Sequence, residues 1–284
     1  MKMKHLLGKR SADQDQSHEL HDLMLEREHL LSNSEDFFVG EAYRTLRTNV
    51  SFSLTGESSS NVVVVTSSLQ HEGKSYTAAN LAISYAQAGK RVLLIDCDLR
   101  KPKISRLLRL HAEAGLSNVL IHPELCKSAL LETKEKNLRV LISGDIPPNP
   151  SELLGSVRMQ KLLEALRSRF EFIILDTPPV NVVTDAAVLA PLSDGILFVI
   201  RAGQSERNAV TSAVDQLRYA NAKILGFVLN GVDPENRNHK KYKKYGRYGE
   251  YSSSYGYDSE KAAETLEDWD LSAGDMDFGN QQGL

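Results

Sequence analysis

The chain has little that would place it outside an ordinary cytoplasmic protein. Its 284 residues include only two cysteines, Cys97 and Cys126, which are too few for a disulfide framework and predict a reducing compartment. The formal net charge is only −3, so no global field directs the chain to nucleic acid, and we expect no nucleic-acid partner. The basic start, MKMKHLLGKR, has too short an apolar centre for a signal peptide, and the longest apolar runs have the length of strands. We therefore expect no membrane span.

Short apolar segments alternate with amphipathic ones over the middle of the chain, and there is no internal repeat. Such βαβα alternation predicts an α/β fold, a mostly parallel sheet with helices on both faces. The expected strands are Val62–Val65, Val92–Ile95, Leu138–Ile142, Phe172–Leu175, Ile196–Ile200 and Ile224–Leu229. The expected helices are Glu35–Leu54, Ser75–Ala88, Ser151–Ser168, Thr184–Pro191 and Glu206–Ala220.

Polar segments flank this central region and predict three parts. Residues 1–33 form a flexible N-terminal arm, with one short helix expected around His18–Leu31. Residues 34–232 form the globular domain. Residues 233–284 have few aliphatic side chains, so we expect a disordered tail with a short helix around Ala262–Trp269.

The segment NVVVVTSSLQHEGKS, residues 61–75, carries the strongest functional signal. A run of four valines predicts a strand buried on both faces, and Gly73-Lys74-Ser75 fits the end of a P-loop, whose backbone N–H groups surround a triphosphate. Lys74 would reach the β- and γ-phosphates, Ser75 would bind Mg²⁺, and the following helix N-terminus would favour the same anion. Ser68 replaces the first glycine of the pattern.

Two further strands are expected to end in carboxylates beside this loop. In VLLIDCDLRKP, Asp96 and Asp98 can face one side of the strand end and Cys97 the other. In FIILDTPP, Asp176 has the Walker B arrangement, which holds Mg²⁺ directly or through water. A solvated strand-end cluster with Arg100 and Lys101 is the alternative for the first motif, and the neighbouring P-loop favours Mg²⁺ and a proton acceptor.

The order of these motifs, followed by tyrosines near the C-terminus, resembles the bacterial tyrosine kinases, P-loop autokinases of capsule and exopolysaccharide systems. The resemblance covers about Glu41–Tyr257, and Asp96-Cys97-Asp98-Leu99-Arg100 separates this family from most other P-loop proteins. The chain departs from the family at His71, often Gly there, and at Tyr76, usually a small hydroxyl residue. A non-Gly residue resists positive φ, so we expect altered loop geometry at His71.

The resemblance implies ATP-dependent phosphoryl transfer to tyrosine, with Mg²⁺ as cofactor. Catalysis is assigned to Asp96, Asp98 and Lys74, with Asp96 as the expected proton acceptor, although Asp96 and Asp98 could exchange roles. Asn230 would read adenine, or it is a turn residue before Gly231. Mg²⁺ ligands are expected at Ser75, Asp98 and Asp176. Nucleotide contacts are expected at Ser68, Gln70, His71, Glu72, Gly73, Lys74, Ser75, Tyr76, Arg100 and Asn230.

The same resemblance implies partners. The segment EAYRTLR places Glu41, Arg44 and Arg47 on one helix face, where the family packs against a neighbouring subunit of a homo-oligomeric ring; a solvated face is the alternative. Lacking a membrane span, the chain is similar to the form that a transmembrane polysaccharide co-polymerase adaptor recruits to the inner face of the plasma membrane. A cognate tyrosine phosphatase is also implied.

The tyrosines of RNHKKYKKYGRYGEYSSSYGY are the expected phosphate acceptors. They are Tyr242, Tyr245, Tyr248, Tyr251, Tyr255 and Tyr257. A basic, aromatic tail that contacts single-stranded nucleic acid or anionic lipid is the alternative. Two rival functions remain for the whole chain: a ParA/MinD-like ATPase, whose signature Lys is absent from Ser67–Gln70, and a nucleotide-gated scaffold of a polysaccharide export complex without enzyme activity.

Overall fold

The computed structural model describes residues 23–33, 36–54 and 60–232. The chain divides into two units, residues 1–232 and 233–284, and the second unit lies entirely outside the described residues. The fold below is therefore that of the first unit.

A seven-stranded sheet forms the centre of this unit, in the order β3-β4-β2-β5-β1-β6-β7. Its neighbouring strands are parallel, except that β3 runs antiparallel to β4. The strands are β1 Asn61–Ser67, β2 Val92–Asp96, β3 Leu131–Glu132, β4 Leu138–Leu141, β5 Phe172–Asp176, β6 Gly195–Arg201 and β7 Ile224–Asn230. The mostly parallel sheet predicted from the sequence is confirmed, and β3 is the one strand that the sequence analysis missed.

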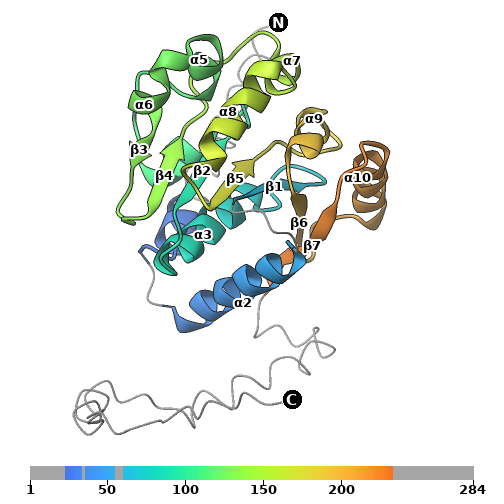
Figure 1. Ribbon diagram of the computed structural model, residues 1–284. Helices are drawn as coiled ribbons and strands as arrows, with labels where there is room; N and C mark the ends of the chain where they lie inside the picture. The colour runs from blue at the N-terminus through green and yellow to red at the C-terminus, as the bar shows by residue number, and fades with distance from the viewer. Residues whose placement is uncertain (1–22, 34–35, 55–59, 233–284) are drawn as a thin grey trace, which may run out of the picture. The chain divides into compact units, whose positions relative to one another are not determined.

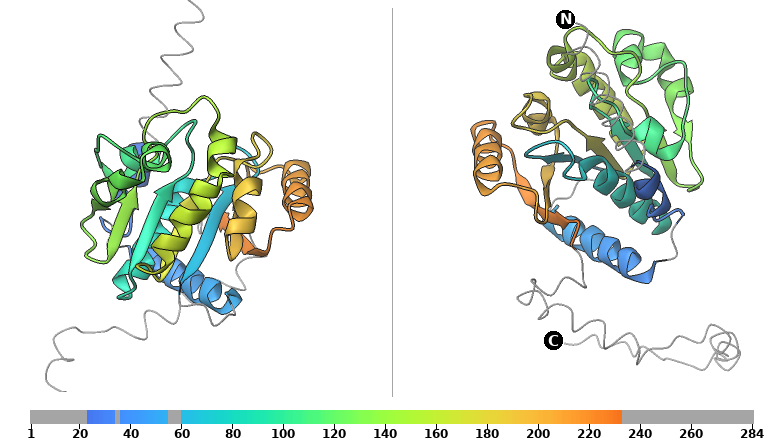
Figure 2. Two further views of the ribbon diagram at one scale, coloured as in Figure 1. Left: turned by 45° about the horizontal axis from the view of Figure 1, so that its top comes forward. Right: turned by 180° about the vertical axis from the view of Figure 1, so that it is seen from behind.

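Helices cover both faces of the sheet (Figures 1 and 2). They are α2 Phe37–Ser53, α3 Lys74–Gln87, α4 Ile104–Leu108, α5 Leu116–Ile121, α6 Cys126–Ala129, α7 Pro150–Leu154, α8 Val157–Arg167, α9 Asp185–Leu189 and α10 Arg207–Tyr219, with 3-10 turns η1 Pro123–Leu125 and η2 Ala190–Leu192. The helix predicted over Ser151–Ser168 is two helices, because the Ser156 side chain accepts a hydrogen bond from the Met159 N–H and begins α8 anew. Helices α4, α5 and α6 were not expected from the sequence.

The core lies in two layers, one on each face of the sheet. The valines of β1 alternate between them: Val62 and Val64 join one layer, Val63 and Val65 the other, and all four are 0% exposed. This alternation confirms a strand covered on both faces. Because α3 packs over the second layer, the loop before it is fixed at the carboxyl end of β1.

The described end of the expected N-terminal arm is packed rather than loose. Residues 23–28 are helical, and Leu23 and Leu30 are buried in the same core layer as α3. The Leu31 N–H donates to the Asn80 side chain, and Arg27 donates to the Arg106 carbonyl. This segment therefore belongs to the folded unit.

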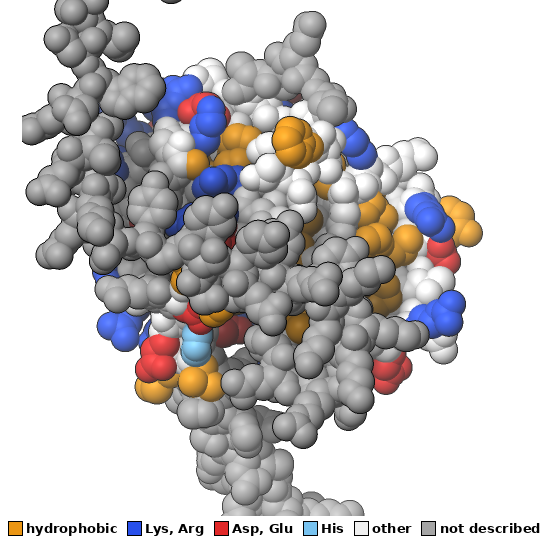
Figure 3. All heavy atoms as spheres, turned by 90° about the horizontal axis from the view of Figure 1, so that it is seen from below, with side chains coloured by type: hydrophobic (Ala, Val, Ile, Leu, Met, Phe, Trp, Pro, Cys, Tyr) orange, Lys and Arg blue, Asp and Glu red, His pale blue; other side chains and the backbone are white. Residues whose placement is uncertain are grey.

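The surface around α2 is partly apolar. Figure 3 views this side of the molecule from below and shows hydrophobic side chains exposed between charged ones. On α2 itself, Phe37, Phe38 and Phe52 are exposed, and on the edge strand β7 so are Phe227 and Leu229. No helix among the described residues is long and apolar enough to cross a membrane.

Candidate active site

The P-loop connects the end of β1 at Ser67 to the start of α3 at Lys74. Gly73 caps α3 with φ 90°, a left-handed conformation that favours glycine, and His71 has φ 64°. The altered loop geometry expected at His71 is thus a positive φ at a non-glycine residue. The loop leaves the first turn of α3 open to an anion.

A cavity of about 320 Å³ lies at this loop. Of the predicted site residues it is lined by Gln70, His71, Gly73, Lys74, Ser75, Asp98 and Arg100. Its walls also include Leu23, Leu25 and Glu26 from the N-terminal segment, which the sequence analysis did not connect to the site. Glu26 forms an ion pair of 2.6 Å with Lys103, which also lines the cavity. The segment before α2 thus closes one side of the cavity.

The carboxylates at the ends of β2 and β5 lie together. Asp96 and Asp176 are partners in the parallel register, while Cys97 packs into the core on the other face, as predicted. Burial raises the pKa of Asp176 to about 6, although the positive charge of Lys74 and the hydroxyl of Ser75 counteract the increase. Neither Asp176 oxygen has a partner within hydrogen-bond geometry among the described residues. A buried carboxylate in this state is suited to a cation.

Asp96 and Asp98 differ in what they face. Both oxygens of Asp96 accept backbone N–H groups, from Asp98 at 3.2 Å and from Lys103 and Ile104 at 3.2 and 3.0 Å. Burial and the nearby Asp176 raise the pKa of Asp96 well above its usual range. Asp98 lines the cavity, and its Oδ2 lies 3.9 Å from the Lys74 ammonium. The geometry thus favours the exchanged roles: Asp98 faces the cavity, and Asp96 holds the turn before α4.

Arg100 is held by a buried carboxylate that the sequence analysis missed. Asp185, at the start of α9, is fully buried and accepts from Arg100 Nε at 3.2 Å and from its Nη2 at 3.3 Å. The Ser151 hydroxyl donates to the same carboxylate at 2.5 Å. No motif marks Asp185, because the element that carries it is distant in sequence from the P-loop. Its effect is to hold the Arg100 guanidinium at the wall of the cavity.

Four predicted nucleotide contacts lie off the cavity wall. Ser68 and Glu72 are buried and bond to each other. The Tyr76 hydroxyl donates to the His29 carbonyl, and burial raises its pKa to about 12. The Asn230 amide donates to the Glu72 carbonyl at 3.2 Å and accepts the Gly231 N–H at 2.9 Å, which fits the turn alternative.

The helix face predicted to contact a neighbouring subunit is divided in two. The side chains of Glu41 and Arg44 are 45% and 59% exposed and form an ion pair with each other. Arg47 instead turns inward and donates to the Ser84 carbonyl of α3 at 2.6 Å. Only Glu41 and Arg44 are thus free to face another molecule. The six predicted acceptor tyrosines lie outside the described residues.

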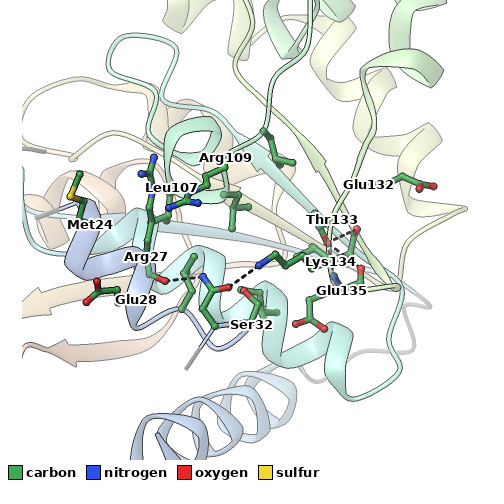
Figure 4. Close-up of a pocket in the computed structure, with 16 residues that line it drawn as sticks. Met24, Arg27, Glu28, Ser32, Leu107, Arg109, Glu132, Thr133, Lys134 and Glu135 are labelled. Atoms are coloured by element: carbon green, nitrogen blue, oxygen red, sulfur yellow. Dashed lines mark hydrogen bonds between the residues drawn. The ribbon is translucent and has the colours of Figure 1, made fainter. Parts of the chain in front are cut away.

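A larger cavity, of about 830 Å³, lies elsewhere and contains none of the predicted site residues. It lies between residues 24–33 and the segments near α4, β3 and β4, and Figure 4 shows its lining. Its lining carries charges of both signs. Arg27 donates to the Arg106 carbonyl, and Lys134 donates to the Asn33 side chain. Size therefore does not identify the site; the converging groups at the P-loop do.

Comparisons with known proteins identify the family of the chain. A family model described as AAA domain matches residues 60–223. Tyrosine-protein kinase YwqD of Bacillus subtilis (strain 168) is 42% identical over 67% of this chain and 80% of its own length. Tyrosine-protein kinase CpsD of Streptococcus agalactiae is 38% identical over 68% of this chain and 83% of its own length.

Solved structures that resemble this chain include tyrosine kinase domains. The kinase domain of Escherichia coli tyrosine kinase ETK has a TM-score of 0.66 and 34% identity, covering 69% of this chain and 77% of its own. The chimerical protein CapA2B2 has a TM-score of 0.65 and 35% identity, covering 71% and 87%. MinD of Pyrococcus horikoshii OT3, complexed with Mg-ADP, shares the fold alone at 22% identity and a TM-score of 0.54. With its P-loop fold and this degree of identity to YwqD, the chain is a nucleotide-binding protein that belongs to the bacterial tyrosine-protein kinases.

Proposed function

We propose that this protein transfers the γ-phosphoryl group of ATP to tyrosine hydroxyls, including those at its own residues 242–257, in the control of capsule or exopolysaccharide synthesis. The convergence of Lys74, Ser75 and Asp98 at one cavity supports the proposal most directly, together with the buried carboxylate of Asp176, which accepts no hydrogen bond from the part of the chain that the structure describes. Together these groups offer a cation for phosphate oxygens and carboxylates for a metal and a proton. Phosphoryl transfer depends chiefly on such positioning and charge stabilisation.

The residues present fit a Mg²⁺ ion completed by the nucleotide. Asp176 and the Ser75 hydroxyl would hold it, with Asp98 within reach of the same region. The described residues contain no group of three or more His, Cys, Asp or Glu side chains able to hold a metal alone. Phosphate oxygens and water must therefore supply the remaining ligands, as is usual for Mg²⁺. When bound, the ion would neutralise negative charge on the phosphates.

Asp98 is our choice for the proton acceptor. As the tyrosine oxygen forms its bond to the γ-phosphorus, its proton passes to the Asp98 carboxylate, and the bond to the β-phosphate oxygen breaks to release ADP. Asp96 is less suited, because backbone N–H groups occupy both of its oxygens. Lys74 and the N-terminus of α3 stabilise the charge on the transferred group. Arg100, fixed by Asp185, adds to the positive charge of the cavity wall.

The acceptor tyrosines can be supplied by a neighbouring copy. We propose a homo-oligomeric ring in which the exposed Glu41–Arg44 face of α2 meets the next subunit. Exposed phenylalanines on the same helix, Phe37, Phe38 and Phe52, support a contact that excludes water. Each tail then reaches the cavity of its neighbour, and phosphorylation occurs in trans.

We further propose that the kinase works in the cytoplasm and is recruited to the plasma membrane by a transmembrane polysaccharide co-polymerase adaptor, with a tyrosine phosphatase reversing its modification. The kinship to kinases named CpsD and to the chimerical CapA2B2 supports this assignment. A nucleotide-gated scaffold would share the cavity and differ only in leaving the tail unmodified. A MinD-like positioning ATPase is less well supported, because the likeness to MinD is one of fold.

The test is mass spectrometry of the purified full-length chain after incubation with Mg-ATP and the cytoplasmic segment of the adaptor. We expect phosphotyrosine in residues 242–257, and we expect Lys74→Met to abolish it because the phosphate-binding charge is lost. Lys161→Met, which removes the same charge from an exposed position on α8, serves as the matched control. ATP hydrolysis without phosphotyrosine would favour the ATPase, and undiminished phosphotyrosine in Lys74→Met would refute this assignment of the loop.

A further inference from the structure

One residue of the P-loop itself carries a buried carboxylate that the proposed chemistry does not use. Glu72 is 1% exposed, and it is absent from the lining of the cavity. Its oxygens accept the Ser68 hydroxyl at 2.7 and 3.0 Å and the Leu69 N–H at 2.7 Å. The Ser205 hydroxyl, from the loop between β6 and α10, donates to Oε1. A buried charge is tolerated only with such partners, so the arrangement calls for an explanation.

Ser205 is itself fixed in place. Its oxygen accepts the Arg201 N–H at 2.8 Å, so the hydroxyl proton is left to point at Glu72. Two further contacts reach the loop from the same side: Arg201 donates to the His71 carbonyl at 3.2 Å, and Asn230 donates to the Glu72 carbonyl at 3.2 Å. The ends of β6 and β7 thus hold consecutive residues of the P-loop.

The conformation of the loop explains why external contacts are needed. His71 and Gly73 both have positive φ, which costs free energy at His71 in particular. A Cβ atom on Gly73 would lie 1.8 Å from the Asn230 amide nitrogen, so the loop and the end of β7 are in close contact. A strained loop persists only where its surroundings determine it.

We propose that Glu72 and Ser205 are a positioning pair for the nucleotide, and that their hydrogen bond holds the P-loop in the shape that binds phosphate. We call Glu72, Ser205 and the two loop donors, Ser68 and Leu69, the loop clamp. The proposal rests on nucleotide binding at the P-loop, not on the identity of the phosphate acceptor. It gives Glu72 a role through the loop in place of the direct nucleotide contact that the sequence suggested.

The hydrogen-bonding groups of the loop clamp can be changed one at a time by substitution. A carboxylate only accepts hydrogen bonds, which suits a site with three donors. Glu72→Gln keeps the shape of the side chain but replaces one acceptor oxygen by an NH₂ group. That group would then face hydrogen-bond donors of the loop clamp. Ser205→Ala removes only the hydroxyl, whereas Ser205→Thr keeps it. Glu206→Gln is the matched control, because the Glu206 side chain is exposed and makes no hydrogen bond or ion pair with any described residue.

The first measurement is the affinity of the full-length protein for Mg-ADP by titration calorimetry. We expect Ser205→Ala to bind about tenfold more weakly, the usual effect of losing a hydrogen bond to a charged group. Ser205→Thr and Glu206→Gln should bind like the wild type. The same loss should appear as a higher KM for ATP with kcat near the wild-type value, because the clamp acts on binding in both the ground and transition states. Loss of fold alone would lower the active fraction and hence kcat instead.

A double-mutant cycle tests whether the pair acts as a unit. If it does, Glu72→Gln combined with Ser205→Ala binds Mg-ADP no more weakly than Glu72→Gln alone. Wild-type affinity in Ser205→Ala, or fully additive losses in the double variant, would overturn the proposal. If Glu72→Gln fails to fold, Ser205→Ala against Ser205→Thr still decides. Wild-type protein that binds Mg-ADP but phosphorylates no tyrosine would refute the proposed kinase activity and leave the clamp intact.

Discussion

At the scale of single residues, the site depends on carboxylates that are chemically alike and differently surrounded. The Asp96 carboxylate accepts hydrogen bonds from backbone N–H groups, and the Asp98 carboxylate lines the cavity near the Lys74 ammonium. The Asp176 carboxylate accepts no hydrogen bond from any described residue. Their environments, rather than their order in the motif, therefore set their roles.

The first prediction separates Asp98 from Asp96. Asp98→Asn should lower kcat for tail phosphorylation by about 100-fold or more, since a general base is lost. Asp96→Asn should instead lower stability, because an amide cannot accept all the backbone N–H groups with both of its terminal atoms. The measurements are kcat and urea unfolding of both variants. A stable, inactive Asp96→Asn beside an active Asp98→Asn would restore Asp96 as the base.

The second prediction follows from the pKa of Asp176, which burial raises from the ordinary 3.8 of an aspartate to about 6. Between these values the folded state binds more protons than the unfolded state, so this group lowers stability as pH rises through the interval. Asp176→Asn should therefore raise the stability of nucleotide-free, metal-free protein at pH 7 to 8 by about 1–3 kcal/mol. Below about pH 4 the gain should vanish, because both states of the wild type are then protonated.

Chemical unfolding in chelator across this pH range checks the prediction. Mg-ADP should stabilise the wild type more than Asp176→Asn, since the carboxylate that destabilises the free protein is the one that binds the ion. A variant that is less stable than the wild type at pH 7 would contradict this account.

At the scale of elements, the strands were predictable and the short helices were not. The six predicted strands are present within two residues at either end, because four- to seven-residue apolar runs bounded by turn residues have few alternatives in an α/β fold. By contrast, α4, α5 and α6 have four to six residues each, too short for a helical period to show. The motif residues were placed correctly at the strand ends, because topology alone brings those ends together.

What the sequence could not predict are contacts between distant segments. Arg47 was expected at an interface because the family has a similar motif before its P-loop strand, and the structure shows its guanidinium bound to Ser84 of α3. Asp185 and Ser205 have no local pattern, and they join the site only through their loops. Leu23 and Leu30 lie in a polar stretch, so their burial could not be read from composition.

The third prediction tests the division of the α2 face. Arg47→Ala should lower the free energy of unfolding by about 1–2 kcal/mol, since two hydrogen bonds to Ser84 are lost. Arg44→Ala should change it by less than about 0.5 kcal/mol, because its pair with Glu41 is exposed. Light scattering should show the converse, with the oligomer weakened by Arg44→Ala. Equal oligomers in Arg44→Ala and wild type would remove this face from the interface.

At the scale of the whole molecule, the proposed function requires the folded unit to act on the tyrosine segment. The site is fixed in residues 23–232, and the chain that follows β7 supplies six tyrosines among Lys240, Lys241, Lys243, Lys244 and Arg247. Unmodified, this segment is basic. The wall of the cavity carries six Lys or Arg side chains beside Glu26 and Asp98, and Asp96 and Asp176 lie behind it. Bound nucleotide phosphates would engage those cations, so the basic tail would enter the nucleotide-loaded site of a neighbouring copy.

The last prediction concerns the tail as a switch. Replacing the six tyrosines by Phe keeps the rings and deletes only the acceptor hydroxyls, so nucleotide binding should persist while most phosphotyrosine disappears. Each phosphate adds about −1.5 to −2 charges at neutral pH, and several of them would repel one another and the carboxylates of the site. Phosphorylation should therefore expel the tail and loosen the ring, and the Phe variant should keep its subunits together longer. The measurement is oligomer mass before and after incubation with Mg-ATP. Equal dissociation of the wild type and the Phe variant would exclude the tail as the switch and favour a nucleic-acid or lipid role for this basic, aromatic segment.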